Sequence, residues 1–452
     1  MAEADVAVVG GGAGGTLVAI QLLRQARSLF SIVLVEGGEK LARGVAYSTS
    51  EPDHLLNVPA GKMSALPDVP DHFARWAGAP DAAFVSRGCY GDYLEQTLRE
   101  SIARAPRGVS LEIRSATAAS ASLVESGIRL QLVRHGHLDA RAAVLALGNF
   151  PSADPPVDDG GLYASDRYGR SPFLPGALDG IDPEATVVFL GSGLTMVDAA
   201  LALRARGHRG PLDAISRHGL APQTHGTARP SRARIGAIGV RGLLRALRVE
   251  VARGGDWRAI FDGFRPATQR IWVRLPIAER ERFLRHLRAY WEAHRHRMAP
   301  AVGQAIAAMR ASGQLSIHAG RVASFALERD GTLVRFRPRG SRELREISCA
   351  RVINCTGPAT RIDEARSSLV SSLLSSGLAR PGCLGIGFAT DGDGAVVGAS
   401  GGRLFTLGSM RRGELWESTA IPELREQARC LAARIAGRWS SELAPVRLHA
   451  SS

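Results

Sequence analysis

The chain has 452 residues, of which 45% are apolar and 22% charged, a balance typical of globular rather than disordered or fibrous proteins. At about 150 residues per domain it can form two or three domains, which excludes a single small binding module. No stretch reaches the ~18 uninterrupted apolar residues of a membrane span, and Glu3 and Asp5 stand where a signal peptide carries positive charge. We therefore expect a cytoplasmic protein with no membrane partner.

The cysteines and histidines argue against thiol chemistry and metal binding. The five cysteines include no C-x-x-C motif or other closely spaced pair, which excludes a disulfide framework, a zinc ribbon and a redox-active thiol pair. There is no H-E-x-x-H motif either, so we expect no metal site.

Most of the net charge of +14 lies in residues 228–312, where 18 arginines stand against six acidic residues. The sequence shows no aromatic stacking motif of the kind that accompanies a nucleic-acid-binding surface, so no nucleic-acid partner is expected. We expect this basic segment to border an anionic substrate or cofactor instead.

A strand, a glycine-rich turn and a helix open the chain. An apolar run leads into G-G-G-A-G-G at residues 10–15, and apolar residues at helical spacing follow. Gly10 permits a tight turn, Gly12 lets the backbone approach a pyrophosphate, and Gly15 lets the helix lie close to the strand. A second apolar run ends in Glu36, whose carboxylate can accept hydrogen bonds from a ribose diol. This pattern predicts a dinucleotide-binding unit.

A near copy of this unit carries G-S-G-L-T-M at residues 191–196. Its second strand ends in Arg217, at the same interval from the first glycine as the acid of the first unit. Arg217, helped by His218, is expected to favour the 2′-phosphate of NADP over a free hydroxyl. Met196 replaces the third glycine and should hold helix and strand further apart. A structural unit without a ligand stays open as the alternative.

Each unit is followed by a similar tail of strand, hairpin and strand ending at a glycine. The strands are predicted at 111–113, 128–133 and 143–147 before Gly148, and at 315–317, 333–336 and 351–355 before Gly357. This internal repeat predicts an α/β protein with two Rossmann-like dinucleotide-binding domains, each with three-layer ββα/β-meander elements. We place the first domain at residues 1–170 and 340–452, and the second, inserted domain at 171–339 with a helical insertion at 228–312.

Two further helices are expected. A last strand at 404–407 is followed by a loop and by a helix at 422–436, whose N-terminus should point at whatever lies beneath the loop. Residues 279–298 predict one amphipathic helix that packs against the core or a domain interface, with a substrate wall as the alternative. Its apolar stripe consists of Phe283, Leu287, Tyr290, Trp291, His294 and Met298.

Eight motifs stand in order along the chain: GGGAGG at 10–15, ARGVAY at 42–47, LLNVPAG at 55–61, VLALGNFP at 144–151, GSGLTMVD at 191–198, SRHG at 216–219, VINCTGP at 352–358 and RRGELWESTAIPE at 411–423. Over nearly the whole chain this set resembles the bacterial FAD/NAD(P)-binding proteins related to FAD-dependent urate hydroxylase and L-aspartate N-monooxygenase. The resemblance implies that the first domain binds FAD, that the inserted domain binds NAD(P)H, and that loops 55–61 and 409–420 approach the flavin.

The predicted cofactors are FAD and NADPH, with NADH as a possible substitute. The predicted cofactor-binding residues are Gly10, Gly12, Ala13, Gly14, Gly15, Glu36, Arg43, Gly148, Gly191, Ser192, Gly193, Leu194, Thr195, Arg217, His218, Gly357, Gly408, Ser409 and Thr419. Many flavoproteins with two dinucleotide units carry Asp where Ser409 stands.

Three side chains are candidates for catalysis and substrate binding. The Asn57 amide can hydrogen-bond the flavin edge, although a turn-stabilising role before Val-Pro explains it as well. Arg411 and Arg412 can bind a carboxylate or a urate-like anion in bidentate fashion.

Two nucleotide sites without a cysteine pair predict hydride transfer from a nicotinamide to a flavin. The main hypothesis is an NADPH- and FAD-dependent monooxygenase that uses molecular oxygen, through a flavin C4a-hydroperoxide, on a small anionic nitrogen-containing substrate. This hypothesis includes both the N-hydroxylation of an amino acid and a urate-like hydroxylation. The alternatives are a flavin reductase or dehydrogenase without oxygen transfer, and a nucleotide-sensing or nucleic-acid-associated regulatory protein. The sequence leads to no prediction of the oligomeric state.

Overall fold

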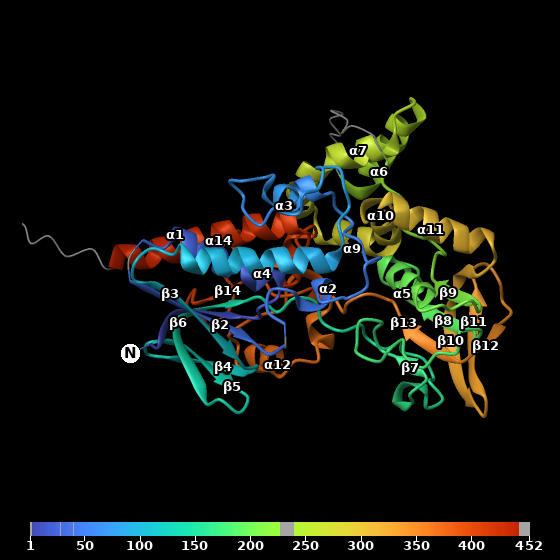
Figure 1. Ribbon diagram of the computed structural model, residues 1–452, viewed down its shortest axis with the longest axis horizontal. Helices are drawn as coiled ribbons and strands as arrows, with labels where there is room; N and C mark the ends of the chain where they lie inside the picture. The colour runs from blue at the N-terminus through green and yellow to red at the C-terminus, as the bar shows by residue number, and fades with distance from the viewer. Residues whose placement is uncertain (1, 28, 39, 227–238, 443–452) are drawn as a thin grey trace, which may run out of the picture.

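The computed structural model describes residues 2–27, 29–38, 40–226 and 239–442, and within them the chain forms two seven-stranded sheets flanked by helices (Figure 1). The first sheet contains β1 (Ala4–Val9), β2 (Phe30–Glu36), β3 (Val109–Ser115), β4 (Ala118–Val124), β5 (Gly127–Leu132), β6 (His137–Leu145) and β14 (Leu404–Thr406). The second contains β7 (Tyr168–Gly169), β8 (Val187–Leu190), β9 (Leu212–Ser216), β10 (Leu315–Glu328), β11 (Gly331–Pro338), β12 (Arg345–Cys349) and β13 (Arg351–Asn354).

The helices fall into three groups. Those of the first sheet are α1 (Ala13–Gln25), α2 (Gly44–Tyr47), α3 (His72–Trp76), α4 (Arg87–Ala103), α12 (Ser368–Ser375), α13 (Arg412–Leu415) and α14 (Ile421–Glu442). The second sheet carries α5 (Leu194–Ala205) and α11 (Pro300–Ala311). Between them in the chain come α6 (Gly239–Ala252), α7 (Trp257–Phe264), α8 (Thr268–Arg274), α9 (Ile277–His286) and α10 (Arg288–Arg295).

The first sheet has the order β3-β2-β1-β6-β5-β4, and β14 pairs with β6. The strands β3, β2, β1, β6 and β14 are parallel, whereas β4, β5 and β6 form an antiparallel meander. The longer β6 makes both arrangements possible, because its first residues pair with β5 and its last residues pair with β14.

The central strand β1 is buried on both faces, as expected for a parallel strand covered on two sides. Val6 and Val8 point into one core with α1, α4 and α14, whereas Ala7 and Val9 point into a second core with the meander and α12. The two-residue period of the strand therefore divides one apolar run between two cores.

The second sheet repeats this plan in the order β12-β11-β10-β9-β8-β13-β7. Its parallel centre runs from β10 to β7, and β10, β11 and β12 form the meander. The meander is joined to the parallel strands through β10 here and through β6 in the first sheet. The predicted fold class of two Rossmann-like units with β-meanders is confirmed.

The predicted domain boundaries differ from the observed sheets. Strands β12 and β13 follow residue 340 but belong to the second sheet, because β12 pairs with β11 and β13 pairs with β8. Strand β7 precedes residue 171 and pairs with β13 in the same sheet. The second sheet therefore extends from residue 168 to residue 354.

The single helix predicted at 279–298 is wrong, since the chain forms α9 and α10 with a break at Leu287 (φ −117°). Helix α10 ends at Arg295 because the next residues turn to pair with the segment after β9. There Met298 bridges Thr224 and is buried in the core of the second sheet. The first residues of the predicted insertion, 228–238, lie outside the described residues.

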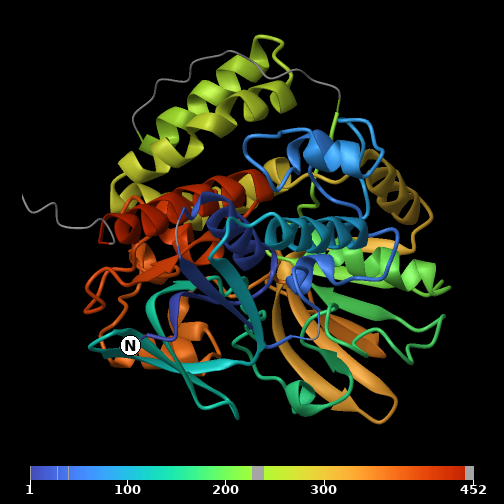
Figure 2. The same cartoon turned by 60° about the vertical axis from the view of Figure 1, so that its left-hand side comes forward.

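Helices α6 to α10 form a layer of their own beside α14, as Figure 2 shows most clearly. In the part of the chain that the structure describes, no helix is long and apolar enough to cross a membrane. The cytoplasmic location stays a prediction.

Candidate active site

The first glycine turn joins β1 to α1 and accepts only glycine at two positions. Gly10 has a φ of 101°, and its N–H donates to the carbonyl of Val35 at 2.8 Å. A Cβ at Gly10 would stand 2.4 Å from the carbonyl oxygen of Ala146, and a Cβ at Gly15 would stand 1.8 Å from that of Gly10. This is the tight turn and the close helix packing expected from the sequence.

The open side of this turn carries backbone N–H groups and a carboxylate. Gly12 is the N-cap of α1, and the first helical turn, with Ala13 and Gly14, has N–H groups without acceptors in the helix. The Glu36 carboxylate accepts a hydrogen bond from the N–H of Gly11 at 2.6 Å, so it lies at the same turn. A pyrophosphate at the helix N-terminus and a ribose at Glu36 both fit these groups.

The second glycine turn, between β8 and α5, repeats the first. Gly191 has a φ of 107°, and its N–H donates to a carbonyl of β9 at 2.8 Å. A Cβ at Gly191 would stand 2.5 Å from the carbonyl oxygen of Cys355. Gly193 is the N-cap of α5 and has open space at its Cβ position, and Leu194 and Thr195 follow in the first helical turn.

The two turns differ at the third glycine position. Where a Cβ at Gly15 would collide with the backbone, Met196 is fully buried in the core between α5 and the sheet. Ser192 Oγ lies 2.7 Å from Ser216 Oγ and 2.5 Å from the carbonyl oxygen of Leu220, which ties the turn to the end of β9. The second unit thus keeps the tight turn but makes room for a side chain between helix and strand.

Both returning strands end at a left-handed glycine. Gly148 follows β6 with a φ of 66°, Gly357 follows β13 with a φ of 85°, and nothing lies within 4 Å of a Cβ at either position. Ser409, at the end of β14, donates through Oγ to the carbonyl of Gly148. The predicted residues Gly148 and Ser409 are therefore brought together at the carboxyl end of the first sheet.

The loop at 409–420 folds back over the end of β14. The N–H of Gly408 donates to Gln427 Oε1 at 3.1 Å, and its carbonyl accepts from Ser418 Oγ at 2.8 Å. Thr419 is exposed just before α14 begins. The N-terminus of α14 therefore lies at the same edge of the sheet as the end of β14.

A cluster of cations stands at the end of β9. Arg217 is exposed, and Nδ1 of His218 lies 3.4 Å from Nη1 of Arg339. Burial, followed by the charges of Arg339, Arg217 and Arg321, lowers the pKa of His218. Within the described residues, these three arginines form no ion pair with a carboxylate, so the cluster is a candidate site for a phosphate.

Sequence reasoning missed Arg321 and Arg339, although the predicted strands held a signal for the first. Strand β10 runs parallel to β9 with Ala319 opposite Ser216, and the carboxyl ends of parallel strands meet at one edge. Arg321 follows that position by two residues. Arg339 reaches the same place through the hairpin, since its N–H donates to the carbonyl of Ala319 at 2.8 Å.

Asn57 lies where the two units meet. Its carbonyl accepts a hydrogen bond from Nε2 of His225, which follows β9, at 3.0 Å. Burial lowers the pKa of His225 to about 4, and its ring lies 5.0 Å from that of Phe84. The structure thus fixes the backbone of Asn57, while the catalytic role of its amide stays a prediction.

Arg43 is held by α4 rather than at the glycine turn. Its guanidinium pairs with Asp92 and lies 3.4 Å from Glu95. The backbone beside it does reach the turn, because a Cβ at Gly12 would stand 3.4 Å from the Cα of Gly44. The backbone of its motif therefore lies on the turn, its side chain is engaged by α4, and the role of Arg43 as a cofactor ligand stays a prediction.

The expectation for Arg411 is corrected. Its side chain is buried, and its Nη2 donates to the carbonyls of Asp391 (3.1 Å) and Gly392 (2.8 Å). Burial lowers the pKa of this guanidinium. Arg411 therefore holds a turn of the protein in place and is not presented to a substrate.

Arg412 points to the helical insertion. It pairs with Glu292 at 3.0 Å, and its guanidinium carbon lies 4.5 Å from the ring centre of Trp416. This residue is therefore engaged by two neighbours, and its role as an anion ligand stays a prediction.

The insertion docks onto the 411–423 segment through directed polar contacts. The Trp272 indole donates to the carbonyl of Gly413 at 2.9 Å, and the Trp291 indole donates to Glu417 Oε1 at 2.9 Å. Arg295 pairs with the same Glu417 at 3.1 Å. These contacts join the helical layer to the loop that precedes α14.

Several arginines of the basic segment are paired with carboxylates of the protein. Within the insertion Arg282 pairs with Glu279 and Arg297 with Asp262, and Arg265 pairs with Glu423 of α14 at 2.8 Å. These three arginines are therefore engaged by carboxylates, and that the basic segment borders an anionic ligand stays a prediction.

A salt bridge joins the two units on the side of α4. Arg87, at the start of α4, forms a bidentate pair with Asp198 of α5 at 2.7 and 3.2 Å. His54 Nε2 adds a hydrogen bond to the carbonyl of Asp198 at 3.0 Å. Since both charged side chains are largely buried, this pair fixes the second glycine helix against the first unit.

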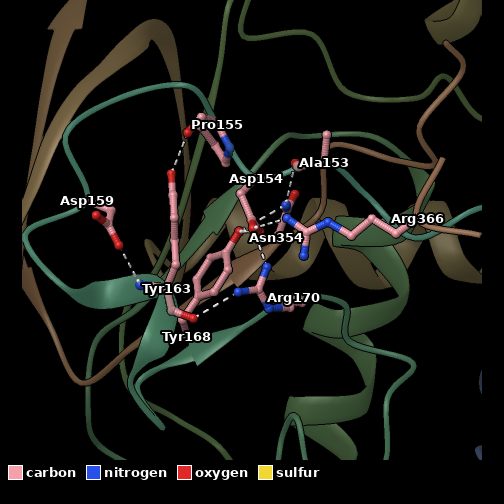
Figure 3. A network of polar contacts seen from close by, with 9 residues as sticks. All are labelled: Ala153, Asp154, Pro155, Asp159, Tyr163, Tyr168, Arg170, Asn354 and Arg366. Atoms are coloured by element: carbon pink, nitrogen blue, oxygen red, sulfur yellow. Dashed lines mark hydrogen bonds and ion pairs between the residues drawn. The ribbon is translucent and has the colours of Figure 1, made fainter. Parts of the chain in front are cut away.

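The two connections between the sheets are joined by the network in Figure 3. Asp154, on the outgoing connection, pairs with Arg170 and lies 3.3 Å from Arg366 on the returning one. Tyr168 donates to Asp154 at 3.0 Å and accepts from Asn354 at 3.0 Å. Burial, followed by the charge of Asp154, raises the pKa of Tyr168. The network fixes how the two sheets are connected.

Comparison with protein families supports the first unit. Residues 7–150 match the model of a family described as FAD-NAD(P)-binding. No curated protein matches the chain significantly in sequence.

Solved structures resemble the whole chain. The ornithine N-hydroxylase of Kutzneria sp. 744, with reduced FAD, NADP⁺ and L-ornithine, has a TM-score of 0.66 at 14% identity over 96% of this chain and 99% of its own. The FAD-bound cadaverine monooxygenase of Erwinia amylovora has a TM-score of 0.66 at 12% identity over 96% and 95%. The thioredoxin reductase of Lactococcus lactis has a TM-score of 0.56 at 11% identity over 98% and 100%.

At these identities the likeness shows the fold and not the reaction. The chain carries an FAD-NAD(P)-binding domain at residues 7–150 and shares its overall fold with these two monooxygenases and with thioredoxin reductase.

Proposed function

We propose that this protein is an FAD-dependent NADPH monooxygenase that uses molecular oxygen on a small nitrogen-containing substrate. The observation that carries the proposal is the duplicated turn: Gly10 and Gly191 have the same strand-to-helix geometry, each packed against its own returning strand. One chain thus offers two dinucleotide sites, in a fold that the ornithine N-hydroxylase shares.

The first unit fits FAD. The N-terminus of α1 beyond Gly12 would hold the pyrophosphate, and Glu36 would hold the adenosine ribose. The left-handed Gly148 leaves open space at the end of β6, where no Cβ obstructs a flat ring. When bound, FAD supplies the redox chemistry, which is the transfer of electrons from NADPH to molecular oxygen.

The second unit fits NADPH. The N-terminus of α5 beyond Gly193 would hold its pyrophosphate, and Arg217 with Arg321 and Arg339 would hold its 2′-phosphate. Since no acid takes the place of Arg217, the 2′-phosphate is favoured over a free hydroxyl. The preference for NADPH over NADH follows from this cluster.

The remaining residues of the site would position groups and exclude water. The loop at 409–420, with the insertion docked on it, folds back over the end of β14, and the Asn57 backbone is held by His225. The Asn57 amide is the candidate hydrogen-bond donor at the flavin edge. A dry pocket matters here because water would compete with the substrate for the activated oxygen.

Disulfide reduction through a redox-active cysteine pair, the reaction suggested by the name thioredoxin reductase, is not supported by this chain. All five cysteines are free, and burial raises the pKa of Cys349 to about 12 and that of Cys355 well above its usual range. Thiols with such pKa values are poor nucleophiles at neutral pH. Oxygen is therefore the acceptor that we propose.

The test is an assay of purified, FAD-loaded protein with NADPH, oxygen-18 and a panel of amines and amino acids. We expect at least one compound to give a hydroxylated product that contains one oxygen-18 atom per NADPH consumed. If every compound gives only hydrogen peroxide in full stoichiometry with NADPH, the protein is an oxidase or reductase and the proposal is wrong.

A further inference from the structure

The helical insertion and Trp416 line a half-open cavity of about 660 Å³, which is within the usual range of small-molecule sites. One wall consists of the apolar side chains of α6, including Leu244 and Leu247. The facing walls are aromatic and include Trp257, Phe261, Trp272, Phe283, Trp291 and Trp416. The cavity is separate from both glycine turns, and the cofactor assignments leave it unexplained.

The aromatic walls are fixed in position rather than free to collapse. Trp272 stacks on Trp416 with ring centres 4.9 Å apart, and the indole N–H groups of Trp272 and Trp291 are bound to Gly413 and Glu417. Filling such a space with collapsed side chains would be favourable, because empty apolar volume destabilises a protein. Rigid walls around an apolar space are what a preorganised ligand site requires.

Trp416 connects this cavity to the proposed flavin site. It has a φ of 61° and ψ of −70°, a backbone conformation that costs free energy in any residue with a side chain. The strained residue belongs to the loop that runs from Gly408 to α14, and its ring lines the cavity. A ligand seated against Trp416 would therefore lie at the loop that borders the end of β14.

The lining also indicates the chemistry of the ligand. Among the lining residues, all of which the structure describes, Arg248 is the one arginine or lysine and no residue is a carboxylate. Burying the ammonium and carboxylate of an amino acid here would cost free energy, because nothing pairs with the ammonium. An apolar group makes favourable contacts with the whole surface.

We propose that this cavity binds the aromatic, apolar body of the substrate and leaves its nitrogen at the Trp416 loop. The inference rests on the proposed function and narrows it: the substrate is an amine with a large aromatic substituent rather than a charged amino acid such as ornithine. The cavity-lining members of the stripe in α9 and α10, among them Phe283 and Trp291, then act as a substrate wall, the alternative that the sequence left open.

The test is isothermal titration calorimetry of the full-length, FAD-loaded protein with 2-phenylethylamine, 4-phenylbutylamine and L-ornithine. Leu247→Trp fills the cavity from α6, and Val249→Trp adds the same ring on the same helix at an exposed residue outside the cavity. Circular dichroism checks that both variants keep their helices. Binding is measured without NADPH, so it does not depend on turnover.

We expect 4-phenylbutylamine to bind more tightly than 2-phenylethylamine, by about fourfold for each added methylene, and ornithine not to bind. Leu247→Trp should weaken 4-phenylbutylamine at least tenfold, and Val249→Trp should leave it unchanged. The inference is overturned if ornithine binds as tightly as 4-phenylbutylamine, or if the two variants behave alike. If the amines bind as expected but NADPH is not oxidised, the proposed function fails while the cavity remains a site for apolar amines.

Discussion

Gly15 lies where α1 is in closest contact with the turn after β1, whereas its neighbour Gly14 lies away from that contact. A Cβ at Gly15 would overlap the carbonyl of Gly10, whereas a Cβ at Gly14 would make an ordinary contact of 3.9 Å with Leu407. We predict that Gly15→Ala destabilises the protein by about 3 kcal/mol and lowers its flavin content, because the backbone of the turn must shift.

Gly14→Ala is the matched control for this prediction. It should be neutral or stabilise by up to about 1 kcal/mol, since alanine is the better helix former. Thermal unfolding and the flavin absorbance of the purified variants measure both effects. Equal stability and flavin content in the two variants would contradict the close packing at Gly15.

In the proposed function, the choice between NADPH and NADH depends on Arg217. Arg217→Glu is expected to weaken NADPH by ~2 to 4 kcal/mol, because one cation of the cluster is lost and a repulsion is added, and to affect NADH much less. Steady-state KM values for both nucleotides measure the difference.

The control is Arg209→Glu, which makes the same change of charge just before β9, at the opposite end of that strand. This exposed arginine pairs with Glu184, far along the strand from Arg217. It should leave both KM values unchanged. Equal losses for NADPH and NADH in Arg217→Glu would show that Arg217 does not bind the phosphate.

Single residues could be predicted where local geometry decides their role. Gly10 and Gly191 have positive φ because a tight turn after a strand requires it, and the sequence pattern contains that turn. Arg411 could not be assigned, because its burial depends on the turn at 391–392, which no local pattern connects to it. Long-range contacts of this kind determine whether an arginine meets solvent, a ligand or a carbonyl.

Among the elements, α4 and α5 depend on each other through Arg87 and Asp198. Arg87→Met would leave the buried carboxylate of Asp198 without its partner, at a cost of about 3 to 5 kcal/mol. The double variant Arg87→Met with Asp198→Leu should be less destabilised than the sum of the two single changes, because no unpaired charge remains.

Urea unfolding of the four proteins in this cycle measures the coupling. If the losses of stability in the two single variants add up exactly to the loss in the double variant, the pair contributes nothing to holding α5 against the first unit. Near-complete recovery in the double variant would show that the pair specifies the geometry and adds little net stability.

The elements of the first unit and the core of the second were predictable, because strands and helices alternate with glycines at their ends. The boundary at residue 340 was not, since β13 pairs with β8 and β7, which precede it by a long stretch of chain, and β12 only follows β11 into the same sheet. The break at Leu287 was not predictable either, because the stripe of α9 and α10 keeps nearly helical spacing across it.

At the scale of the whole molecule, the buried histidines predict sensitivity to acid. Burial lowers the pKa values of His225, to about 4, and of His72, His208 and His296. These histidines stay neutral in the folded protein, whereas in the unfolded chain they become protonated below pH ~6.5. Their contribution to the free energy of unfolding is therefore fully present above pH ~6.5 and is lost as the pH falls towards 4.

His225→Gln should flatten this dependence, and His135→Gln, on an exposed turn, should not. The contribution of His225 is expected to be about 2 kcal/mol, below the full value of its shift because its ring is partly exposed. Urea midpoints between pH 7 and pH 4.5 measure it. If the urea midpoint depends on pH in the same way with and without His225→Gln, burial of the His225 ring is not the cause of that dependence.

The repeated unit made the architecture of the whole molecule predictable, whereas the packing of the predicted helical insertion was not. Its arginines suggested a surface for anions, but ion pairs such as Arg265 with Glu423 turn several of them inward, and its aromatic residues surround an apolar cavity. Composition gives the charge of a segment, and only the fold shows which of its side chains are paired or buried.

We propose that both glycine turns bind a nucleotide and that electrons pass between the two nucleotides. Anaerobic addition of NADPH to the purified protein, followed by its visible spectrum, tests this most directly. One FAD per chain and rapid bleaching by NADPH, faster than by NADH, is the predicted result. A protein that stays colourless after incubation with FAD, or whose flavin stays oxidised with excess NADPH, would contradict the account.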